Sequence, residues 1–424
     1  MKLRIGFIGS GSRSASYACH LKKHGVEVEY PAICDTNPEF SNRFNEFYAG
    51  GQAALYADYR EMLDKHRDLD GVVICTPNDQ HEEIAVACIQ ANAHILLEKP
   101  LATTPRSCLN ILNASWQHGK SVTLGFVLRY TPFYRKIREI VTSGICGDIL
   151  TVNAEEIVNP YVTRLMMGGW RRKSARSGGA LLEKCCHDLD VFNWIIGKLP
   201  VRVHSFGSLK SFPRKPDAGP RCRDCRLASE CAYYFNVDDY SLEIQRAHEW
   251  GFLLTWSDNC LYDGEADVCD HQVMSLEYGD GTLLNFTMTF GSDINTRTVR
   301  IIGDKGRVEG DISAKEVRVG TLKPFLQESF KIADDGTCHD GGDGEICRSF
   351  IRSIVDPDHS PSATVEDGFR SAMVAFAAER SRNECRPVEL AELYAELGLG
   401  VEAIVVPDEC GVAKGQGVTD GGIQ

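Results

Sequence analysis

The first 125 residues alternate short apolar runs with segments whose apolar residues recur at helical spacing. Near-continuous apolar runs are typical of strands buried on both faces of a parallel sheet. Because strands and helices alternate, we predict a doubly wound α/β sheet with ligands beyond the carboxyl ends of its strands. Strands are expected at 3–8, 29–35, 71–75, 94–97 and 121–126, and helices at 81–91 and 104–118.

From about residue 127 the pattern changes to strands joined by turns. The pair Asp280-Gly281 between two of these strands is the signal of a tight hairpin. Hairpins indicate an antiparallel or mixed sheet, so a second, α+β domain is predicted. Its helices are expected at 132–143, 179–196 and 365–383, and its strands at 147–157, 201–209, 270–278, 281–290, 298–302 and 306–311.

The first apolar run ends in Gly9-Ser10-Gly11, and a helical segment follows. Glycines let the backbone turn tightly, and the free N–H groups at a helix start can bind a pyrophosphate. The third position of the G-x-G-x-x-G fingerprint is Ser14, so a turn without a ligand fits this motif alone equally well. Asp35 ends the next strand, where an acid binds the adenosine ribose. Together these features predict a dinucleotide site, for NAD rather than NADP, because Asp35 would repel an additional phosphate.

Composition narrows the class of protein. A chain of 424 residues is too long for one typical core, so two domains are expected. The net charge of −13 argues against nucleic-acid partners and against an anionic membrane surface. No apolar run reaches the length of a membrane span, and the start of the chain does not read as a signal peptide, so we expect a cytoplasmic protein. In that compartment the 17 cysteines would be thiols or metal ligands.

Two segments outside the glycine turn carry candidate chemistry. Lys99 follows a buried strand and precedes Pro100, which disfavours helix and holds the lysine extended at the strand end. It could polarise a substrate hydroxyl, or it could be a solvated loop lysine. Glu183, His187 and Asp190 fall at i, i+4 and i+7, on one helix face. This face suits a general base with an orienting carboxylate, although a hydrogen-bonded structural histidine is an equal alternative.

The Cys-rich insertion at 210–262 contains a C-x2-C-x5-C pattern. In a cytosolic protein this spacing indicates a structural zinc site. The ion would stabilise the insertion, which is too polar to form a hydrophobic core of its own. Unmetallated thiols remain the alternative. The expected metal ligands are Cys222, Cys225, Cys231 and Cys260.

In this order and spacing the motifs resemble the glucose–fructose oxidoreductase/inositol dehydrogenase/MocA family, over residues 1 to about 395. The stretches that carry the resemblance are Gly9–Arg13, Cys75–Asn78 with His81, Glu98–Pro100 and the helix with Glu183, His187 and Asp190. The resemblance implies an N-terminal Rossmann domain and a C-terminal domain whose open, mainly antiparallel sheet mediates dimers or tetramers. It maps the catalytic lysine onto Lys99 and the D-x-x-x-H pair onto Glu183 and His187, with Glu in place of Asp. The cysteine insertion is not part of the general family pattern.

We therefore expect an NAD-dependent oxidoreductase that transfers hydride between the cofactor and a carbohydrate-like substrate. This substrate would be a sugar, a polyol or a related hydroxyl compound. His187 would take the hydroxyl proton and Lys99 would polarise the oxygen. The alternatives are a redox-neutral glycoside hydrolase that works by transient oxidation and elimination, and a non-catalytic nucleotide-binding protein. A homodimer or homotetramer is expected, with no nucleic-acid or membrane partner.

The expected boundaries are 1–126 for the Rossmann domain, 127–408 for the second domain and 409–424 for a flexible tail. The catalytic candidates are Lys99, His187 and Glu183. The cofactor candidates are Gly9, Gly11, Ser12, Arg13, Asp35, Thr76, Pro77, Asn78, His81, Glu98 and Lys99. The substrate candidates are Arg129, Tyr130, Trp170, Arg171 and Asp190.

Overall fold

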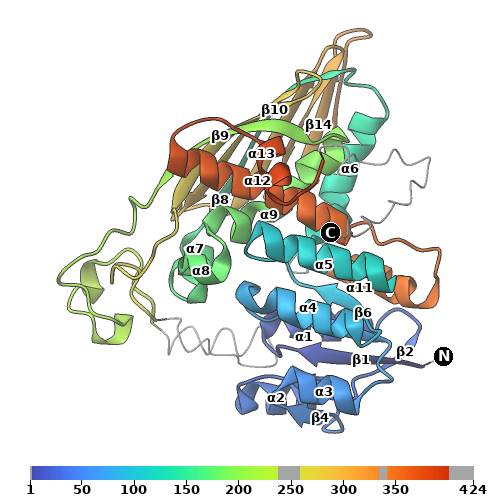
Figure 1. The fold of residues 1–424 in the computed structure, drawn as a ribbon. Coiled ribbons are helices and arrows are strands. Elements are labelled where there is room, and N and C mark those ends of the chain that lie inside the picture. The colour runs from blue at the N-terminus through green and yellow to red at the C-terminus, as the bar shows by residue number, and fades with distance from the viewer. Residues whose placement is uncertain (1, 237–257, 334–340, 401–424) are drawn as a thin grey trace, which may run out of the picture.

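The computed structural model describes residues 2–236, 258–333 and 341–400, which form two sheets with helices packed on them (Figure 1). The first sheet is parallel and has the strand order β4-β3-β1-β5-β6-β7, with β2 beside β1. This order confirms the predicted dinucleotide-binding fold, whose ligand crevice lies where the order reverses, between β1 and β5. The strands are β1 (Lys2–Ile8), β2 (Glu27–Glu29), β3 (Ala32–Cys34), β4 (Ala54–Tyr56), β5 (Gly71–Ile74), β6 (His94–Leu97) and β7 (Val122–Leu124).

Helices cover the first sheet, and one of them comes from late in the chain. The helix α11 packs on α1, and α4 packs on α5. Phe350 of α11 lies so close to Gly71 of β5 that a Cβ there would be 2.8 Å from its ring. The C-terminal part of the chain therefore completes a layer of the nucleotide half. The helices are α1 (Ser12–Leu21), α2 (Pro38–Tyr48), α3 (Tyr59–Lys65), α4 (His81–Gln90), α5 (Pro105–His118) and α11 (Gly342–Val355).

The second sheet has the order β15-β14-β13-β12-β8-β11-β10-β9-β16. Only the β8–β11 pair is parallel, which confirms a mainly antiparallel sheet. The predicted hairpin joins β10 to β11, where the Tyr278 N–H donates to the Thr282 carbonyl at 2.9 Å. The strands are β8 (Ile149–Val158), β9 (Pro200–Ser208), β10 (His271–Tyr278), β11 (Leu283–Phe290), β12 (Thr296–Gly303), β13 (Gly306–Asp311), β14 (Glu316–Thr321), β15 (Leu326–Lys331) and β16 (Val388–Glu389).

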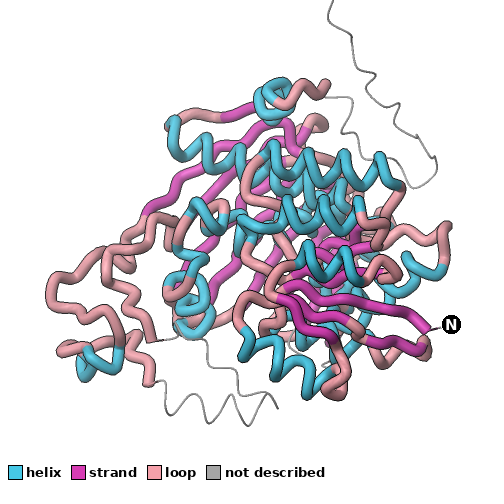
Figure 2. The backbone as a smooth tube through the Cα atoms, turned by 60° about the horizontal axis from the view of Figure 1, so that its bottom comes forward, coloured by secondary structure: helices cyan, strands magenta, loops and turns pink. Residues whose placement is uncertain are grey.

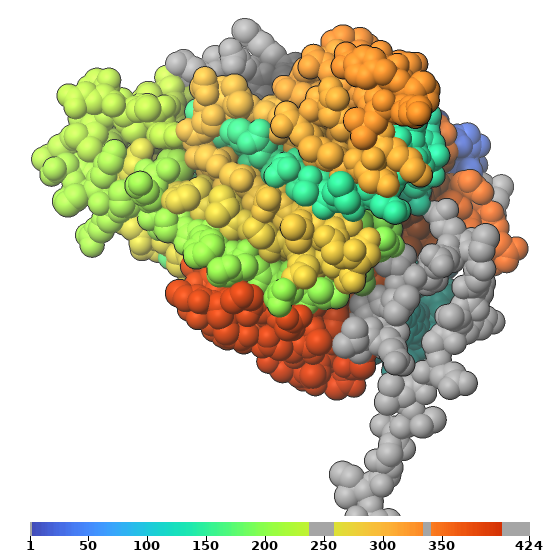
Figure 3. All heavy atoms as spheres, turned by 90° about the horizontal axis from the view of Figure 1, so that it is seen from above, coloured from blue at the N-terminus to red at the C-terminus, as the bar shows by residue number. Residues whose placement is uncertain are grey.

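The inner face of this sheet packs on α6 (Pro132–Thr142), α9 (Ala180–Ile196) and α12 (Val365–Glu384). The helix α12 also packs on α5 and joins the two halves, because the Leu124 N–H of β7 donates to the Ala363 carbonyl just before α12. On the outer face the strands lie open to view (Figure 3). The site candidates on α9 therefore lie between the second sheet and the nucleotide half.

The predicted insertion forms mostly loops, with short 3-10 turns at η4 (Cys222–Asp224) and η5 (Ala228–Glu230). The backbone tube shows it projecting beside the two sheets (Figure 2). Residues 237–257 of the insertion and the predicted tail at 409–424 lie outside the described residues. None of the helices in the described ranges has the length and apolar character that crossing a bilayer requires.

Candidate active site

The glycine turn after β1 has the geometry of an anion-binding loop. Gly9 has a φ of +81°, and a Cβ there would lie 2.8 Å from the carbonyl atoms of Cys75, so only glycine fits. A Cβ on Gly11 would meet no atom within 4 Å, so a ligand can approach the backbone there. The helix α1 begins at Ser12, and no side chain caps it. Its first N–H groups can therefore receive a phosphate oxygen.

Ser14 explains why the third glycine of the fingerprint can be absent. Its side chain is fully buried, and its hydroxyl donates to the Gly9 carbonyl. The Ser14 side chain fits inside the turn, and its hydrogen bond closes the turn. It thus takes the place of the third glycine, which allows close packing in the usual fingerprint. The fingerprint therefore differs in sequence while the turn keeps its shape.

Asp35 lies at the end of β3, beside the turn. One carboxylate oxygen accepts hydrogen bonds from the Ser10 N–H at 2.7 Å and the Ser10 hydroxyl at 2.9 Å. The other accepts from the Asn37 N–H at 2.8 Å. At the end of β5, the buried Thr76 hydroxyl makes no hydrogen bond to any described part of the protein. An acid at the ribose position and a spare buried donor near the crevice both fit a dinucleotide.

His81 connects the ends of β5 and β6. Its ring is fully buried, with Nδ1 at 2.8 Å from the Pro100 carbonyl and Nε2 at 3.1 Å from the Thr76 carbonyl. The imidazole thus fixes the loop after Lys99 relative to the loop that carries Thr76. The predicted cofactor residue His81 acts here by positioning two neighbouring loops.

The central contact of the site joins Lys99, at the end of β6, to Glu183 of α9. The Lys99 Nζ lies 2.6 Å from the Glu183 carbonyl oxygen and 3.3 Å from its Oε1. Glu183 is 2% exposed, and its carboxylate also accepts from Asn78 Nδ2 at 2.6 Å and from Arg171 Nε at 2.7 Å. Three of the predicted site residues therefore converge on the carboxylate of a fourth, Glu183. Asn78, predicted as a cofactor residue, faces Glu183 in this arrangement.

Charge pairing sets the ionisation of this contact. Burial opposes the charge of Lys99, but the nearby carboxylate of Glu183 outweighs it and raises the pKa of Lys99. Burial likewise opposes the charge of Glu183, but Lys99 and Arg171 outweigh it and lower the pKa of that carboxyl group. The lysine is therefore an ammonium donor at neutral pH and has no lone pair with which to accept a proton.

His187 lies one turn along α9 from Glu183, and its ring centroid is 5.8 Å from that of Phe126. The Glu183 carbonyl that binds Lys99 is also the helical acceptor position for the His187 N–H. The lysine of the nucleotide half thus docks on the turn of α9 that leads to the histidine, about 6 Å from it along the helix axis. The convergence of the Lys99 and His187 side chains beside one nicotinamide ring stays a prediction.

Two predicted substrate residues lie on the same side as this contact. Arg171 belongs to η3 (Trp170–Arg172), between α7 (Pro160–Met167) and α8 (Ser174–Ser177). Its guanidinium stacks 4.5 Å from the centre of the Trp170 ring while its Nε binds Glu183. Through Arg171, the segment around η3 therefore contacts the same carboxylate that pairs with Lys99.

The other predicted substrate residues form a separate buried cluster. Arg129, in η2 (Val127–Tyr130), donates from Nε and Nη2 to the two carboxylate oxygens of Asp190 at 2.7 and 2.6 Å. Its Nη1 reaches Asp367 of α12 at 3.0 Å. Tyr130 is also buried, and its hydroxyl donates to Ser349 of α11 at 3.4 Å. The structure does not bring these side chains to Lys99; it uses them to join η2, α9, α11 and α12.

Arg13 and Glu98, predicted as cofactor residues, pair with each other beside α1. The Arg13 Nη1 also lies 2.8 Å from Asp343 Oδ1 of α11, and its Nη2 donates to the Tyr17 hydroxyl at 2.8 Å. Tyr17 and Asp343 are not among the site residues that the sequence predicts. Tyr17 follows Arg13 by one helical turn, which is a usable signal, whereas nothing local in the sequence links Asp343 to this cluster.

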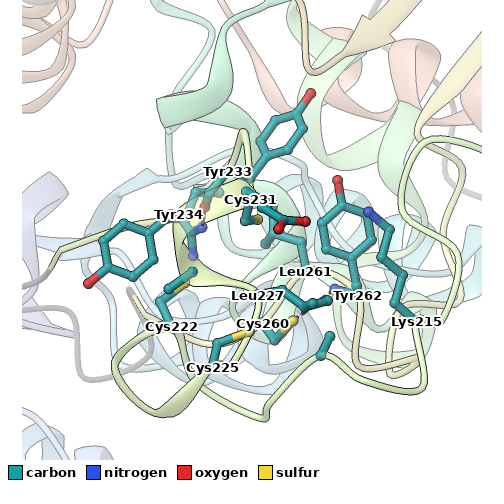
Figure 4. Close-up of a pocket in the computed structure, with 14 residues that line it drawn as sticks. Lys215, Cys222, Cys225, Leu227, Cys231, Tyr233, Tyr234, Cys260, Leu261 and Tyr262 are labelled. Carbon is teal, nitrogen blue, oxygen red and sulfur yellow. Dashed lines mark hydrogen bonds between the residues drawn. The ribbon is translucent and has the colours of Figure 1, made fainter.

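The four predicted cysteine ligands line one cavity of about 130 Å³ in the insertion (Figure 4). Cys222 and Cys260 are buried, and Cys225 and Cys231 are half-buried. All 15 cysteines in the described ranges are free thiols. Within those ranges, no group of three or more His, Cys, Asp or Glu side chains already has the close spacing of a bound metal. The thiols are thus gathered around one space without being drawn to a single point.

Comparison with known proteins identifies the family. A model of the oxidoreductase family, NAD-binding Rossmann fold, matches residues 3–126. A second, for the C-terminal alpha/beta domain of the same family, matches residues 138–390. The Bacillus subtilis protein YteT is 27% identical over 425 residues, covering 92% of this chain and 98% of YteT. The inositol 2-dehydrogenase of Salmonella typhimurium is 28% identical over 228 residues, which cover 54% of this chain and 63% of that enzyme. The D-glucoside 3-dehydrogenase of Escherichia coli is 29% identical over 214 residues, covering 48% of this chain and 58% of that enzyme.

Solved structures show the same fold. An oxidoreductase domain protein from Kribbella flavida gives a TM-score of 0.72 at 20% identity, covering 92% of this chain and 99% of that one. A levoglucosan dehydrogenase in complex with NADH gives a TM-score of 0.72 at 19% identity over the same shares. With both domain models matched in order, the chain belongs to the Gfo/Idh/MocA family of oxidoreductases.

Proposed function

We propose that this protein is an NAD-dependent dehydrogenase that transfers hydride between the cofactor and a CH–OH group of a sugar, polyol or related compound. The observation that carries the proposal is the docking of Lys99, from the nucleotide-binding half, on the turn of α9 that leads to His187. Relatives that act on inositol and on D-glucosides support the substrate class.

The roles of the two candidate groups follow from their ionisation and position. Lys99 stays protonated, so it donates a hydrogen bond to the substrate oxygen and stabilises the negative charge that develops there. His187 accepts the hydroxyl proton, since imidazole exchanges protons near neutral pH. Glu183 is a positioning residue, because its contacts are to Lys99, Arg171 and Asn78. The bound nicotinamide ring would supply the hydride acceptor.

The glycine turn and Asp35 would hold the cofactor. The N–H groups at the start of α1 suit the pyrophosphate, and Asp35 suits the adenosine ribose. Gly9, Gly11, Ser12, Thr76 and Pro77 border this crevice in the proposal. Arg13, Asn78, His81 and Glu98 would shape it through the contacts described above, while Trp170 and Arg171 would meet the substrate.

A homo-oligomer built on the outer face of the second sheet is also proposed. Four apolar side chains are exposed there, and Phe206 of β9 is the cross-strand neighbour of Val273 of β10. Leu283 and Ile302 lie on the same face by strand register. A sheet face that exposes aromatic and aliphatic side chains is typical of an interface.

We further propose that the protein is cytoplasmic and that it holds a structural zinc ion. Free thiols throughout the described ranges support a reducing compartment, the cytoplasm. The cysteine cavity supports a structural Zn²⁺ ion outside the reaction centre, which would take no part in hydride transfer.

The first test is turnover and its dependence on Lys99. NADH absorbance is expected to rise when the protein is mixed with NAD and a panel of inositols, sugars and alkyl glucosides. Lys99→Met should lower kcat by about 10²–10⁴-fold, because charge stabilisation and proton transfer contribute on that scale. Calorimetry should show that Lys99→Met binds NAD nearly as tightly as the wild type. The control variant is Lys23→Met, which changes an exposed lysine. Full activity of Lys99→Met, or aglycone release without net NADH, would contradict the proposal.

The second test separates positioning by Glu183 from direct catalysis. Glu183→Gln removes the main counter-charge of Lys99, so the pKa of Lys99 should fall and the variant should lose activity at a lower alkaline pH than the wild type. Glu183→Asp keeps the charge and should retain the wild-type alkaline limit with a reduced kcat. The pH dependence of kcat is the measurement, with Glu83→Gln on the surface of α4 as the control. An unchanged alkaline limit in Glu183→Gln would show that the pair does not set the ionisation of Lys99.

The third test concerns cofactor choice. The wild type should prefer NAD to NADP by at least about tenfold in kcat/KM, because contact between like charges costs several kcal/mol. Asp35→Ser should reduce that ratio, while weakening both cofactors through the lost contacts to Ser10 and Asn37. Asp64→Ser, an exposed change on α3, is the matched control. A ratio unaffected by Asp35→Ser would remove this residue from the ribose site.

The fourth test concerns assembly. Sedimentation velocity should give a dimer or tetramer for the wild type. Phe206→Lys combined with Val273→Lys should dissociate it, because each subunit would bury two adjacent lysines without a partner charge in the interface. Phe47→Lys, at an exposed apolar position on α2, should leave the assembly intact. A monomeric wild type, or an unchanged oligomer in the double variant, would overturn the proposed interface.

A further inference from the structure

The cysteine cavity is built by two segments that are fastened together by their backbones. The Cys222 N–H donates to the Asp258 carbonyl at 2.7 Å, and the Cys260 N–H donates to the Pro220 carbonyl at 2.9 Å. The buried carboxylate of Asp258 forms ion pairs with Arg221 and Arg223. The positions of Cys222 and Cys260 are therefore fixed relative to each other by main-chain and charged contacts.

Backbone donors point at two of the sulfurs. The Gly219 N–H lies 3.5 Å from Cys225 Sγ, and the Tyr262 N–H lies 3.3 Å from Cys260 Sγ. Each of these N–H groups fixes the direction of its sulfur, and Cys225 and Cys260 line the same cavity. Two of the four sulfurs are therefore held in place by the backbone.

The cavity also contains compensating positive charge. Four thiolates around one Zn²⁺ carry a net charge of −2, and the two cations among the lining residues are Arg164 and Lys215. Arg164 is 5% exposed and donates from Nη1 to the Asn259 carbonyl at 3.0 Å, next to Cys260. Both cations offset part of the negative charge of a zinc tetrathiolate, and the lining residue Glu230 adds one negative charge.

The same segment holds the loop that carries Arg171. Asn259 Nδ2 donates to the Gly168 carbonyl at 2.9 Å, and Arg172 Nη1 donates to the Cys260 carbonyl at 3.2 Å. The Asp267 N–H donates to the Arg172 carbonyl at 3.1 Å. Residues 168–172 are thus attached to the cysteine segment on one side, while Arg171 reaches Glu183 on the other.

We propose that Cys222, Cys225, Cys231 and Cys260 bind one Zn²⁺ ion, and that this ion fixes residues 168–174 against the active site. Zn–S bonds are about 2.3 Å long, so the four sulfurs move inward around the ion when it binds. The site is closed by protein ligands and is therefore structural. Its effect on substrate binding rests on the proposed function, whereas metal content does not.

Metal content is the first measurement. Purified full-length protein from zinc-supplied cells should hold about one zinc per chain after dialysis, by plasma mass spectrometry. Titration with a mercurial should release that zinc to a metallochromic dye, and Co²⁺ replacement should give a thiolate-to-metal charge-transfer band. Cys225→Ser and Cys260→Ser should lose most of the metal, whereas the exposed Cys385→Ser should keep it.

If the serine variants do not fold, the metal content of the wild-type protein still decides whether the site exists. Zinc far below one per chain after reconstitution would overturn the site, as would four thiols that all react freely in zinc-supplied protein or a disulfide among them. Zinc retained in both serine variants would overturn the assigned ligands.

Hydrogen exchange tests the link to the loop without any substrate. Removing the ion from the full chain should speed amide exchange in 168–174 and leave exchange in β5 unchanged, because β5 lies in the core of the other sheet. In turnover assays the apo protein should show a raised KM for the sugar with little change in KM for NAD. Unchanged exchange in 168–174 after zinc removal would refute the coupling while leaving the metal site standing.

Discussion

The ion pair between Lys99 and Glu183 is the contact on which the arrangement of the site depends. Its partners come from the carboxyl end of β6 and from α9, so it can form only when the two halves of the molecule are packed. Both side chains are taken out of water, and a buried ion pair repays its desolvation only when its remaining hydrogen-bonding positions are filled. Asn78 and Arg171 fill those positions on the carboxylate. The pair thus requires the surrounding residues that also shape the crevice.

The connectivity of the chain enforces that packing. The helix α11 returns to lie on α1, and Asp343 at its start pairs with Arg13. The helix α12 follows and packs on α5 and α9, while Arg129 binds both Asp190 of α9 and Asp367 of α12. Contacts between such distant parts of the chain hold α9 at a fixed distance from the first sheet. The predicted substrate residues Arg129 and Asp190 thereby act on the site through its framework.

Local patterns in the sequence predicted most of the described strands but missed α2, α3, α7, α8, α11 and the helix Leu390–Glu396, and the strand expected at 29–35 is divided into β2 and β3. The helix expected at 179–196 is Ala180–Ile196, and the strand expected at 306–311 is β13, because apolar periodicity directly reflects which face of an element is buried. The position of Lys99 at a strand end also followed from its local sequence. Each of these depends on a few neighbouring residues and on no distant contact.

What local patterns could not give is the partner of each side chain. Glu183 and Asp190 share one helix stripe, yet Glu183 meets Lys99 and Arg171 while Asp190 meets Arg129. Helical spacing shows that two residues lie on the same face of a helix. The face of α9 that carries Glu183 and Asp190 is long, however, and extends from the crevice into the buried core. The choice of partner is made by elements such as α12 and η3, whose positions depend on tertiary packing.

The replacement of the family's Asp by Glu183 shows how the site tolerates a change in its own motif. The shorter of the two contacts from Lys99 Nζ, at 2.6 Å, is to the main-chain carbonyl of Glu183, which any residue at this position provides. The length of the side chain therefore does not decide where the lysine docks. The additional methylene moves the carboxylate outward by about 1.5 Å, where it accepts from Arg171 as well as from Asn78. In this chain the longer acid links the lysine to the η3 segment, and that segment in turn is attached to the cysteine insertion.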